Sequence, residues 1–211
     1  MYETPILYSF RRCPYAMRAR LVLFACQITC ELREVVLRDK PKEMLTISPK
    51  ATVPVLQLSD DTIIDESRDI ITWAIEQNDP NDWQQYINEM NDLIDINDQQ
   101  FKTHLDKYKY SSHHPDLSKE EHRENGDFFL KLLNQRLKQQ KFLSSDKQTV
   151  TDLGIFPFIR QFAFVDKEYF DQLEYTYLQN WLEWHLKSPL FGNIMQKYDK
   201  WLPNSEKLFF A

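Results

Sequence analysis

Apolar and polar residues alternate in two different ways along the chain, and the pattern changes near residue 80. Before that point, short apolar runs typical of buried strands are interleaved with stretches that repeat apolar side chains every three or four residues, as helices do. This order predicts an α/β domain. The predicted strands are 5–10, 30–37, 53–58 and 62–64, and the predicted helices are 14–26, 41–47 and 67–77.

A cluster of turn-forming residues at 78–82 marks the predicted domain boundary, and the chain beyond it has an almost entirely helical pattern. Two capping boxes, Ser118-Lys-Glu-Glu121 and Thr149-Val-Thr-Asp152, predict helix starts. We therefore expect two domains, 1–78 and 83–211. The predicted helices of the second domain are about 83–110, 118–137, 153–164 and 174–187.

Length and composition agree with two folded domains and exclude several classes of function. The 211 residues, 42% of them hydrophobic, suffice for one large domain or two small ones with real cores. A formal net charge of −6 repels the phosphates of nucleic acids and of anionic lipids, so we expect no nucleic-acid partner and no membrane partner. Only three glycines occur, none placed to form a phosphate-cradling loop.

No stretch of the sequence predicts export or membrane insertion. The longest strongly apolar run, near residues 21–26, is far shorter than the ~20 residues that a membrane span needs. The first residues lack the apolar core of a secretory signal. We therefore expect a cytoplasmic protein whose three cysteines are free thiols.

Cys13 is the strongest candidate for a reactive group, because it directly precedes a predicted helix. Pro14 suits the first helical position, which makes Cys13 the N-cap. The positive end of the helix dipole favours a thiolate over a thiol, and Arg11 and Arg12 add positive charge, so we expect a lowered pKa for Cys13. The position of a resolving cysteine, three residues further on, is occupied by Ala16.

The other two cysteines are interpreted as packing residues. Cys26 lies on the same predicted helix, about 20 Å from Cys13 at ~1.5 Å per residue, too far for a disulfide. Cys30 follows it and has no local route to Cys13 either. A site with one thiol needs an external thiol to complete a turnover, and glutathione is the obvious cytosolic candidate.

The sequence resembles the glutathione transferase superfamily, and most closely its cysteine-type, omega-like branch of dehydroascorbate reductases and thioltransferases. The resemblance rests on C-P-Y-A-x-R-x-R-L-V-L at 13–23, T-V-P-V-L at 52–56, D-E-S at 65–67 and the capping box at 149–152. It implies the glutathione transferase fold, an α/β thioredoxin-like N-terminal domain plus an all-α C-terminal domain. By the same analogy we expect a homodimer.

The resemblance also implies a set of glutathione-binding residues. A cis peptide bond at Val53-Pro54 turns the backbone N–H and C=O of Val53 outward, where they pair with the cysteinyl backbone of glutathione. Glu66 holds the α-ammonium of the γ-glutamyl group, and Ser67, at a helix start, binds its carboxylate. Lys40 matches the lysine that reaches the glycine carboxylate.

Two further sets of residues are interpreted as having no catalytic or metal-binding role. Thr149 and Asp152 are a structural capping box, preceded at 142–146 by a segment that lacks the glycine usual in the family. His113, His114 and His122 lack the spacing and the companions of a metal site, so we expect no metal.

The leading hypothesis is a glutathione-dependent transferase in which the Cys13 thiolate carries out thiol-disulfide exchange on a small-molecule or protein-disulfide acceptor. One alternative is conjugation of glutathione to a small electrophile, with Tyr8 or Ser9 assisting. Another is a non-catalytic transferase-fold module that binds a protein partner. A specialised enzyme for one catabolic substrate is a third, and the sequence does not separate it from a general thioltransferase.

Overall fold

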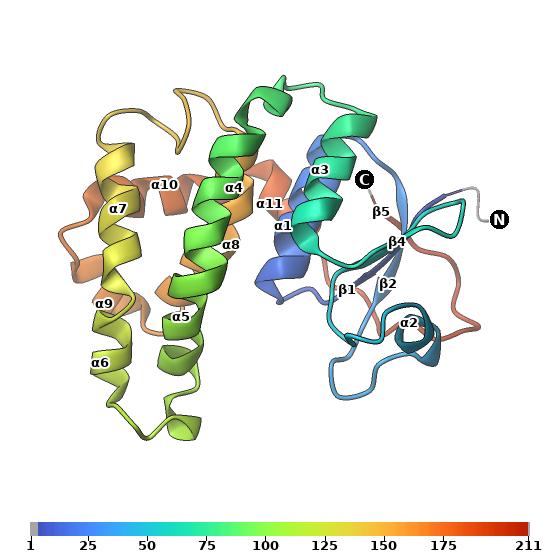
Figure 1. Ribbon diagram of the computed structural model, residues 1–211, viewed down its shortest axis with the longest axis horizontal. Coiled ribbons are helices and arrows are strands. Elements are labelled where there is room, and N and C mark those ends of the chain that lie inside the picture. The colour runs from blue at the N-terminus through green and yellow to red at the C-terminus, as the bar shows by residue number, and fades with distance from the viewer. Residues whose placement is uncertain (1–3, 211) are drawn as a thin grey trace. The chain divides into compact units, whose positions relative to one another are not determined.

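The computed structural model describes residues 4–210, which form two compact units (Figure 1). The first unit runs to Gln84 and takes up the chain again at Pro189, and the second is Gln85–Ser188. Within the described residues, no helix is both long and apolar enough to cross a membrane. The predicted fold class, an α/β unit and an all-helical unit, is confirmed.

The first unit is built on a five-stranded sheet with the order β4-β3-β1-β2-β5. Strands β1 and β2 run parallel, joined by helix α1, and the other strands pair antiparallel with their neighbours. Helix α1 packs against α3 and α11. The strands are β1 Ile6–Ser9, β2 Cys30–Glu34, β3 Val55–Gln57, β4 Ile63–Ile64 and β5 Phe209–Phe210, and the helices are α1 Pro14–Ala25, α2 Lys42–Ile47, α3 Ser67–Gln77 and α11 Pro189–Ile194.

Strand β5 was not predicted, and it joins the last part of the chain to the sheet of the first unit. Phe209–Phe210 pairs with the edge of β2, and the Leu32 N–H donates to the Leu208 carbonyl at 2.7 Å. A two-residue strand is stabilised by its partner and leaves no periodic pattern in the sequence. The predicted second domain, 83–211, therefore extends further along the chain than the compact helical unit.

The second unit consists of helices packed around aromatic side chains. Phe101 lies 4.9 Å from Phe129 and 5.6 Å from Phe162, between ring centroids. The predicted long helix over 83–110 is present as a 3-10 turn, α4, a π-helical turn and α5. These elements are Trp83–Tyr86, α4 Ile87–Ile96, Asn97–Phe101 and α5 Lys102–Lys109, followed by a 3-10 turn Ser111–His113, α6 Lys119–Glu124, α7 Asp127–Leu137, α8 Val150–Ala163, α9 Lys167–Gln172 and α10 Thr176–Lys187.

The predicted helix over 118–137 is wrong as a single helix, although its capping box is present. The Glu121 N–H donates to Ser118 Oγ at 3.1 Å, and α6 starts there as expected. The chain then breaks at Gly126, and α7 begins one residue later. A Cβ at Gly126 would lie 3.2 Å from the Phe162 ring, so the backbone passes close to the aromatic core at a residue that is itself a poor helix former.

The second capping box stabilises other parts of the helical unit as well as the start of its own helix. The buried carboxylate of Asp152 accepts hydrogen bonds from the N–H and the Oγ1 of Thr149, at 2.8 and 3.0 Å. It also accepts from the Leu143 N–H at 2.9 Å and from the Trp181 indole at 2.8 Å. Asp152 thus fixes the segment before α8, where the family glycine is missing, and ties α10 to α8. Burial raises the pKa of Asp152 against these four donors.

Candidate active site

Cys13 occupies the N-cap of α1, as predicted. Its backbone is extended, Pro14 follows at the first helical position, and the Met17 N–H donates to the Cys13 carbonyl at 2.8 Å. The thiol is half-buried, and its Sγ lies 3.7 Å from the Val53 carbonyl oxygen. The first turn of α1 therefore presents a partly accessible thiol beside the segment that precedes β3.

The Val53-Pro54 peptide bond is cis, as the resemblance implies. Val53 belongs to the buried cluster of the first unit against which Cys13 packs. Within residues 4–210 the backbone N–H of Val53 makes no hydrogen bond, and its carbonyl oxygen lies 3.7 Å from the Cys13 Sγ. The structure thus brings two of the predicted site residues, Cys13 and Val53, into direct contact.

The two arginines expected to assist Cys13 are anchored by other groups. Arg12 is exposed, with its guanidinium 5.6 Å from the centre of the Phe10 ring. The Arg11 backbone N–H donates to Glu34 Oε1 at 2.8 Å, and its Nη1 lies 3.4 Å from the Met195 carbonyl. Both residues belong to the loop that leads from β1 into α1.

Arg20 is a buried cation that interacts electrostatically with Cys13, and it was not among the predicted site residues. It is 1% exposed, and it donates to Ser9 Oγ at 3.0 Å and to the Arg11 carbonyl at 2.7 Å. Glu34 Oε2 lies 3.9 Å away. Burial lowers the pKa of Arg20 to about 10, and the charges of Glu34 and of a Cys13 thiolate oppose that shift. Burial also disfavours the charged form of Glu34, and so it raises the pKa of that carboxyl group.

The signal for Arg20 was present in the sequence. Arg18 and Arg20 interrupt a helix that is otherwise apolar almost all round, and such a helix is buried, so both guanidinium groups need partners. Arg18 finds one in Ser67, whose Oγ accepts from Arg18 Nε at 2.9 Å. This bond links the helix that carries Cys13 to the start of α3.

Glu66 and Ser67 lie at the N-terminus of α3, as predicted. Glu66 is the exposed N-cap residue, and Ser67 begins the helix with its side chain buried. Lys50, which the sequence analysis also missed, donates to Glu66 Oε1 at 2.7 Å and to Asp65 Oδ1 at 3.0 Å. These carboxylates raise the pKa of Lys50 to about 12. Ser48 Oγ donates to the other oxygen of Asp65 at 2.9 Å.

Lys40 lies apart from these contacts. It follows β2 in a loop beside a pocket of about 270 Å³, together with Lys42, Lys200 and Trp201. Lys200 pairs with Asp39 at the rim. In the part of the chain that the structure describes, no hydrogen bond or ion pair joins Lys40 to another predicted site residue.

The hydroxyls considered for direct activation of glutathione are buried and already bonded. Tyr8 is 1% exposed, and its hydroxyl accepts from Arg33 Nη1 at 2.6 Å. Ser9 is fully buried, with its Oγ on Arg20. Neither hydroxyl is presented to solvent as the Cys13 thiol is.

Cys26 and Cys30 are buried, in line with their interpretation as packing residues. Burial raises the pKa of each to about 12, so both are protonated, unreactive thiols near neutral pH. Cys13 is the one cysteine of the three with partial exposure.

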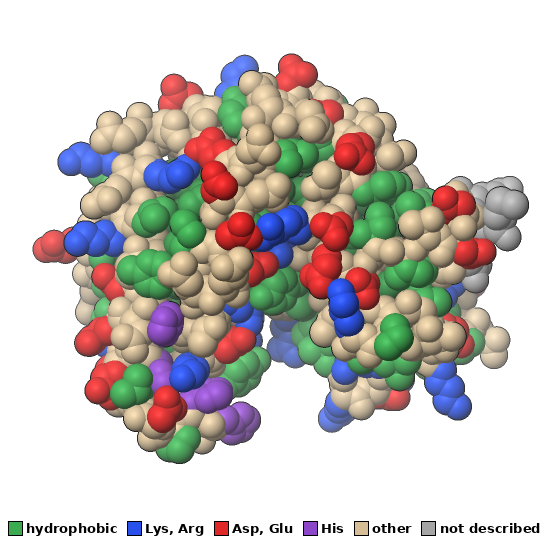
Figure 2. Space-filling model, in the orientation of Figure 1, with side chains coloured by type: hydrophobic (Ala, Val, Ile, Leu, Met, Phe, Trp, Pro, Cys, Tyr) green, Lys and Arg blue, Asp and Glu red, His purple; other side chains and the backbone are tan. Residues whose placement is uncertain are grey.

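The histidines predicted not to bind metal lie at one end of the second unit, near α5 and α6 (Figure 2). His122 is fully buried, and its Nε2 lies 3.1 Å from the His114 carbonyl oxygen. Asp116 Oδ1 lies 3.7 Å from the same nitrogen. Across residues 4–210, no three His, Cys, Asp or Glu side chains are grouped to hold a metal ion.

Two family models match the chain. The glutathione S-transferase N-terminal domain matches residues 7–83, and the glutathione S-transferase C-terminal domain matches residues 118–183, together more than half of the sequence. The chain belongs to the glutathione S-transferase superfamily. The glutathione transferase fold predicted for it is thereby confirmed.

Curated relatives match this chain over short stretches. It is 44% identical over 61 residues to glutathione S-transferase omega-2 of Homo sapiens, a match covering 29% of this chain and 25% of the human protein. Pyrimidodiazepine synthase of Drosophila melanogaster is 44% identical over 52 residues, 25% of this chain and 21% of the relative. The matches thus span a quarter or less of these proteins' length.

Solved structures resemble this protein over nearly the whole chain. A glutathione transferase from Phanerochaete chrysosporium in complex with oxidized glutathione has a TM-score of 0.78 at 20% identity, covering 90% of this chain and 94% of that one. A glutathione transferase family member from Pseudomonas fluorescens with two glutathione bound has a TM-score of 0.77 at 16% identity, covering 92% of each chain. At these identities the likeness shows the fold.

Proposed function

We propose that this protein catalyses glutathione-dependent thiol-disulfide exchange, with Cys13 as the nucleophile, glutathione as co-substrate and no metal. The observation that carries the proposal is the contrast among three thiols. Cys13 is partly exposed at a helix N-terminus, while Cys26 and Cys30 are buried with the pKa of each raised to about 12. Thiolates, and not thiols, are the attacking species in disulfide exchange.

The exchange proceeds in two displacements. The Cys13 thiolate attacks the glutathionyl sulfur of a mixed disulfide, a Cys13-glutathionyl disulfide forms, and the acceptor leaves as a thiolate that takes a proton from water. A glutathione thiolate then attacks the glutathionyl sulfur. Oxidised glutathione leaves, and the Cys13 thiolate is restored. In all, one glutathione thiol is oxidised, the acceptor sulfur of the mixed disulfide is reduced to a thiol, and one disulfide is exchanged for another.

The charges around Cys13 support a thiolate. Helix α1 contributes the positive end of its dipole, with unpaired N–H groups in its first turn. Arg20 adds a buried guanidinium whose attraction to a Cys13 thiolate works against the cost of its own burial. Because Arg20 is removed from water, this attraction is weakly screened.

Glutathione binding is assigned to the residues that the family resemblance implies. The free N–H and the carbonyl of Val53 pair with its cysteinyl backbone, as in strand addition. Ser67 and the N-terminus of α3 bind the γ-glutamyl carboxylate, and Glu66 binds the ammonium with the carboxylate oxygen that Lys50 leaves open. Lys40 binds the glycine carboxylate as a point charge.

The test is turnover of a mixed disulfide between glutathione and 2-mercaptoethanol, followed through the oxidised glutathione produced. Cys13→Ser is expected to lower the rate to that without protein, whereas Cys26→Ser, which changes a buried thiol, retains activity. Activity of Cys13→Ser near the wild-type rate would contradict the proposal and favour conjugation without a protein thiol.

Retention on glutathione resin separates catalysis from binding. The wild-type protein is expected to be retained and released by free glutathione, and Glu66→Ala to be retained less. A chain that flows through the resin and also lacks turnover fits the alternative of an interaction module whose glutathione site has decayed.

Compartment and assembly form part of the same proposal. Cys13, Cys26 and Cys30 are all free, which suits a reducing cytoplasm where glutathione is abundant. By analogy with the superfamily we propose a homodimer, and its mass by analytical ultracentrifugation is expected to be twice that of the 25.4 kDa chain.

A further inference from the structure

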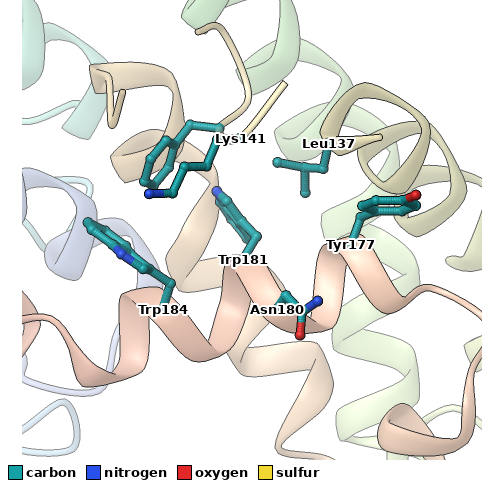
Figure 3. A pocket seen from close by; sticks show the side chains of 7 residues that line it. Leu137, Lys141, Tyr177, Asn180, Trp181 and Trp184 are labelled. Atoms are coloured by element: carbon teal, nitrogen blue, oxygen red, sulfur yellow. The ribbon is translucent and has the colours of Figure 1, made fainter. Parts of the chain in front are cut away.

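The helical unit contains a pocket of about 280 Å³ that the proposed exchange reaction does not use. It lies between α10 and the end of α7 with the segment that follows, and Figure 3 shows the side chains around it. Four of its seven residues are aromatic. The lining residues are Leu137, Lys141, Phe142, Tyr177, Asn180, Trp181 and Trp184.

Two walls of this pocket are fixed by one buried carboxylate. Asp152 Oδ1 accepts from the Trp181 indole N–H at 2.8 Å and from the backbone N–H of Leu143 at 2.9 Å. Leu143 directly follows Phe142, so the same oxygen holds the Trp181 ring and the segment that carries Phe142. A pocket whose walls are held before a ligand arrives loses little conformational entropy on binding.

The buried histidine that packs against three of the aromatic walls, without lining the pocket itself, is uncharged. His185 is fully buried, with ring centroids 4.7 Å from Trp181, 5.0 Å from Trp184 and 6.0 Å from Phe142. Burial lowers the pKa of His185 to about 3, so the imidazole is neutral at physiological pH. The imidazole therefore acts here as a further aromatic ring.

Lys141 supplies the positive charge of the pocket. Its ammonium lies 5.6 Å from the centre of the Phe142 ring, and within residues 4–210 it forms no ion pair. The carboxylate of Asp146 accepts from its backbone N–H at 3.2 Å. Figure 3 shows Lys141 on the side to which the Trp181 and Trp184 indoles point. A cation without an ion-pair partner among residues 4–210 therefore lies over the buried Phe142 ring, in a pocket that Trp184 also lines.

We propose that this pocket binds a planar aromatic anion of one or two rings. The ring stacks on the Trp184 indole, which is 41% exposed, and the anionic group pairs with Lys141. Asn180 offers a neutral amide to a second polar substituent. The volume is just below the range of about 300–1,000 Å³ typical of ligand pockets, which limits the ligand to this size.

The test is titration calorimetry of the full chain with 1-naphthoate. Lys141→Met is expected to weaken binding about tenfold, the value of one charge-assisted hydrogen bond. Lys138→Met removes an exposed lysine three residues earlier that does not line the pocket, and is expected to bind as wild type. The neutral 1-naphthamide is expected to bind wild type about tenfold more weakly than 1-naphthoate.

Stacking is tested separately by Trp184→Ala, which is expected to weaken 1-naphthoate binding by about threefold to tenfold. The matched control is Phe164→Ala, an exposed aromatic residue of the same unit outside the pocket. Saturating S-methylglutathione is expected to leave the affinity for 1-naphthoate unchanged.

Three results would overturn the proposal. The first is the absence of binding at about 1 mM 1-naphthoate, a concentration at which even a weak site is occupied. The second is an equal loss of affinity in Lys138→Met and Lys141→Met. The third is displacement by S-methylglutathione, which would assign 1-naphthoate to the glutathione site. None of these measurements depends on Cys13, so the outcome is independent of the exchange mechanism.

Discussion

At the scale of single residues, the surroundings of a side chain determine its chemistry more than its identity does. The chain has three cysteines, and only Cys13 combines partial exposure with a helix N-terminus and a nearby buried cation. Arg20 illustrates the same rule for a cation. Its guanidinium is held among Ser9, the Arg11 carbonyl and Glu34, which costs desolvation and keeps a positive charge within electrostatic reach of Cys13.

Replacement of this cation tests its effect on Cys13. Arg20→Gln is expected to move the pH of half-maximal Cys13 alkylation by iodoacetamide upward, because a fixed positive charge no longer favours the thiolate. Arg20→Lys keeps the charge and is expected to lie closer to wild type. Arg12→Gln, at an exposed position, serves as the control. An equal shift for Arg12→Gln and Arg20→Gln would show that the exposed arginine contributes as much as the buried one.

At the scale of elements, the helical unit depends on a few buried polar contacts. Asp152→Ala is expected to lower the free energy of unfolding by about 3 kcal/mol, because it leaves several buried donors without an acceptor. Ser118→Ala removes the cap of α6, which is exposed, and is expected to cost clearly less. Urea denaturation measures both, and equal losses would contradict the central role given to Asp152.

The packing of α10 on α8 is expected to weaken in acid. His185 stacks on Phe156 at 4.8 Å, and burial lowers its pKa from 6.5 to about 3. Between these values the unfolded chain binds a proton that the folded chain excludes, so stability is lost as pH falls below 6.5.

The comparison variant for this pH effect is His185→Phe. Between about pH 7 and pH 5, wild type is expected to lose about 2 kcal/mol more unfolding free energy than the variant, as measured by urea denaturation. An equal loss in the two proteins would show that other groups account for the acid sensitivity.

At the scale of the whole molecule, short sequence patterns predicted the features that depend on residues close together in the sequence. The N-cap at Cys13, both capping boxes and the succession of strands and helices along the first unit all follow from short-range periodicity and helix-end chemistry. The break at Gly126 and strand β5 depend on aromatic packing and on pairing with β2, between segments far apart in sequence. A single sequence does not encode such contacts as a pattern.

The same division applies to the candidate site. Residue types at a helix start predicted Cys13 as a candidate, whereas Glu66 and Ser67 were predicted from the family resemblance, and all three lie at helix N-termini. Arg20 and Lys50 were missed, because their importance depends on partners that the fold brings to them. The apolar residues that surround Arg20 along α1 were the one local feature of the sequence that indicated a buried, partnered cation.

The most direct test of the account is intact-protein mass spectrometry after incubation with oxidised glutathione, followed by peptide mapping. We expect one glutathionyl adduct per chain, on Cys13, that excess reduced glutathione removes. Cys13→Ser is predicted to take no adduct, and Cys26→Ser and Cys30→Ser to take one. An unmodified Cys13 in the wild-type protein, or an adduct on Cys13→Ser equal to that of wild type, would contradict covalent exchange at this thiol.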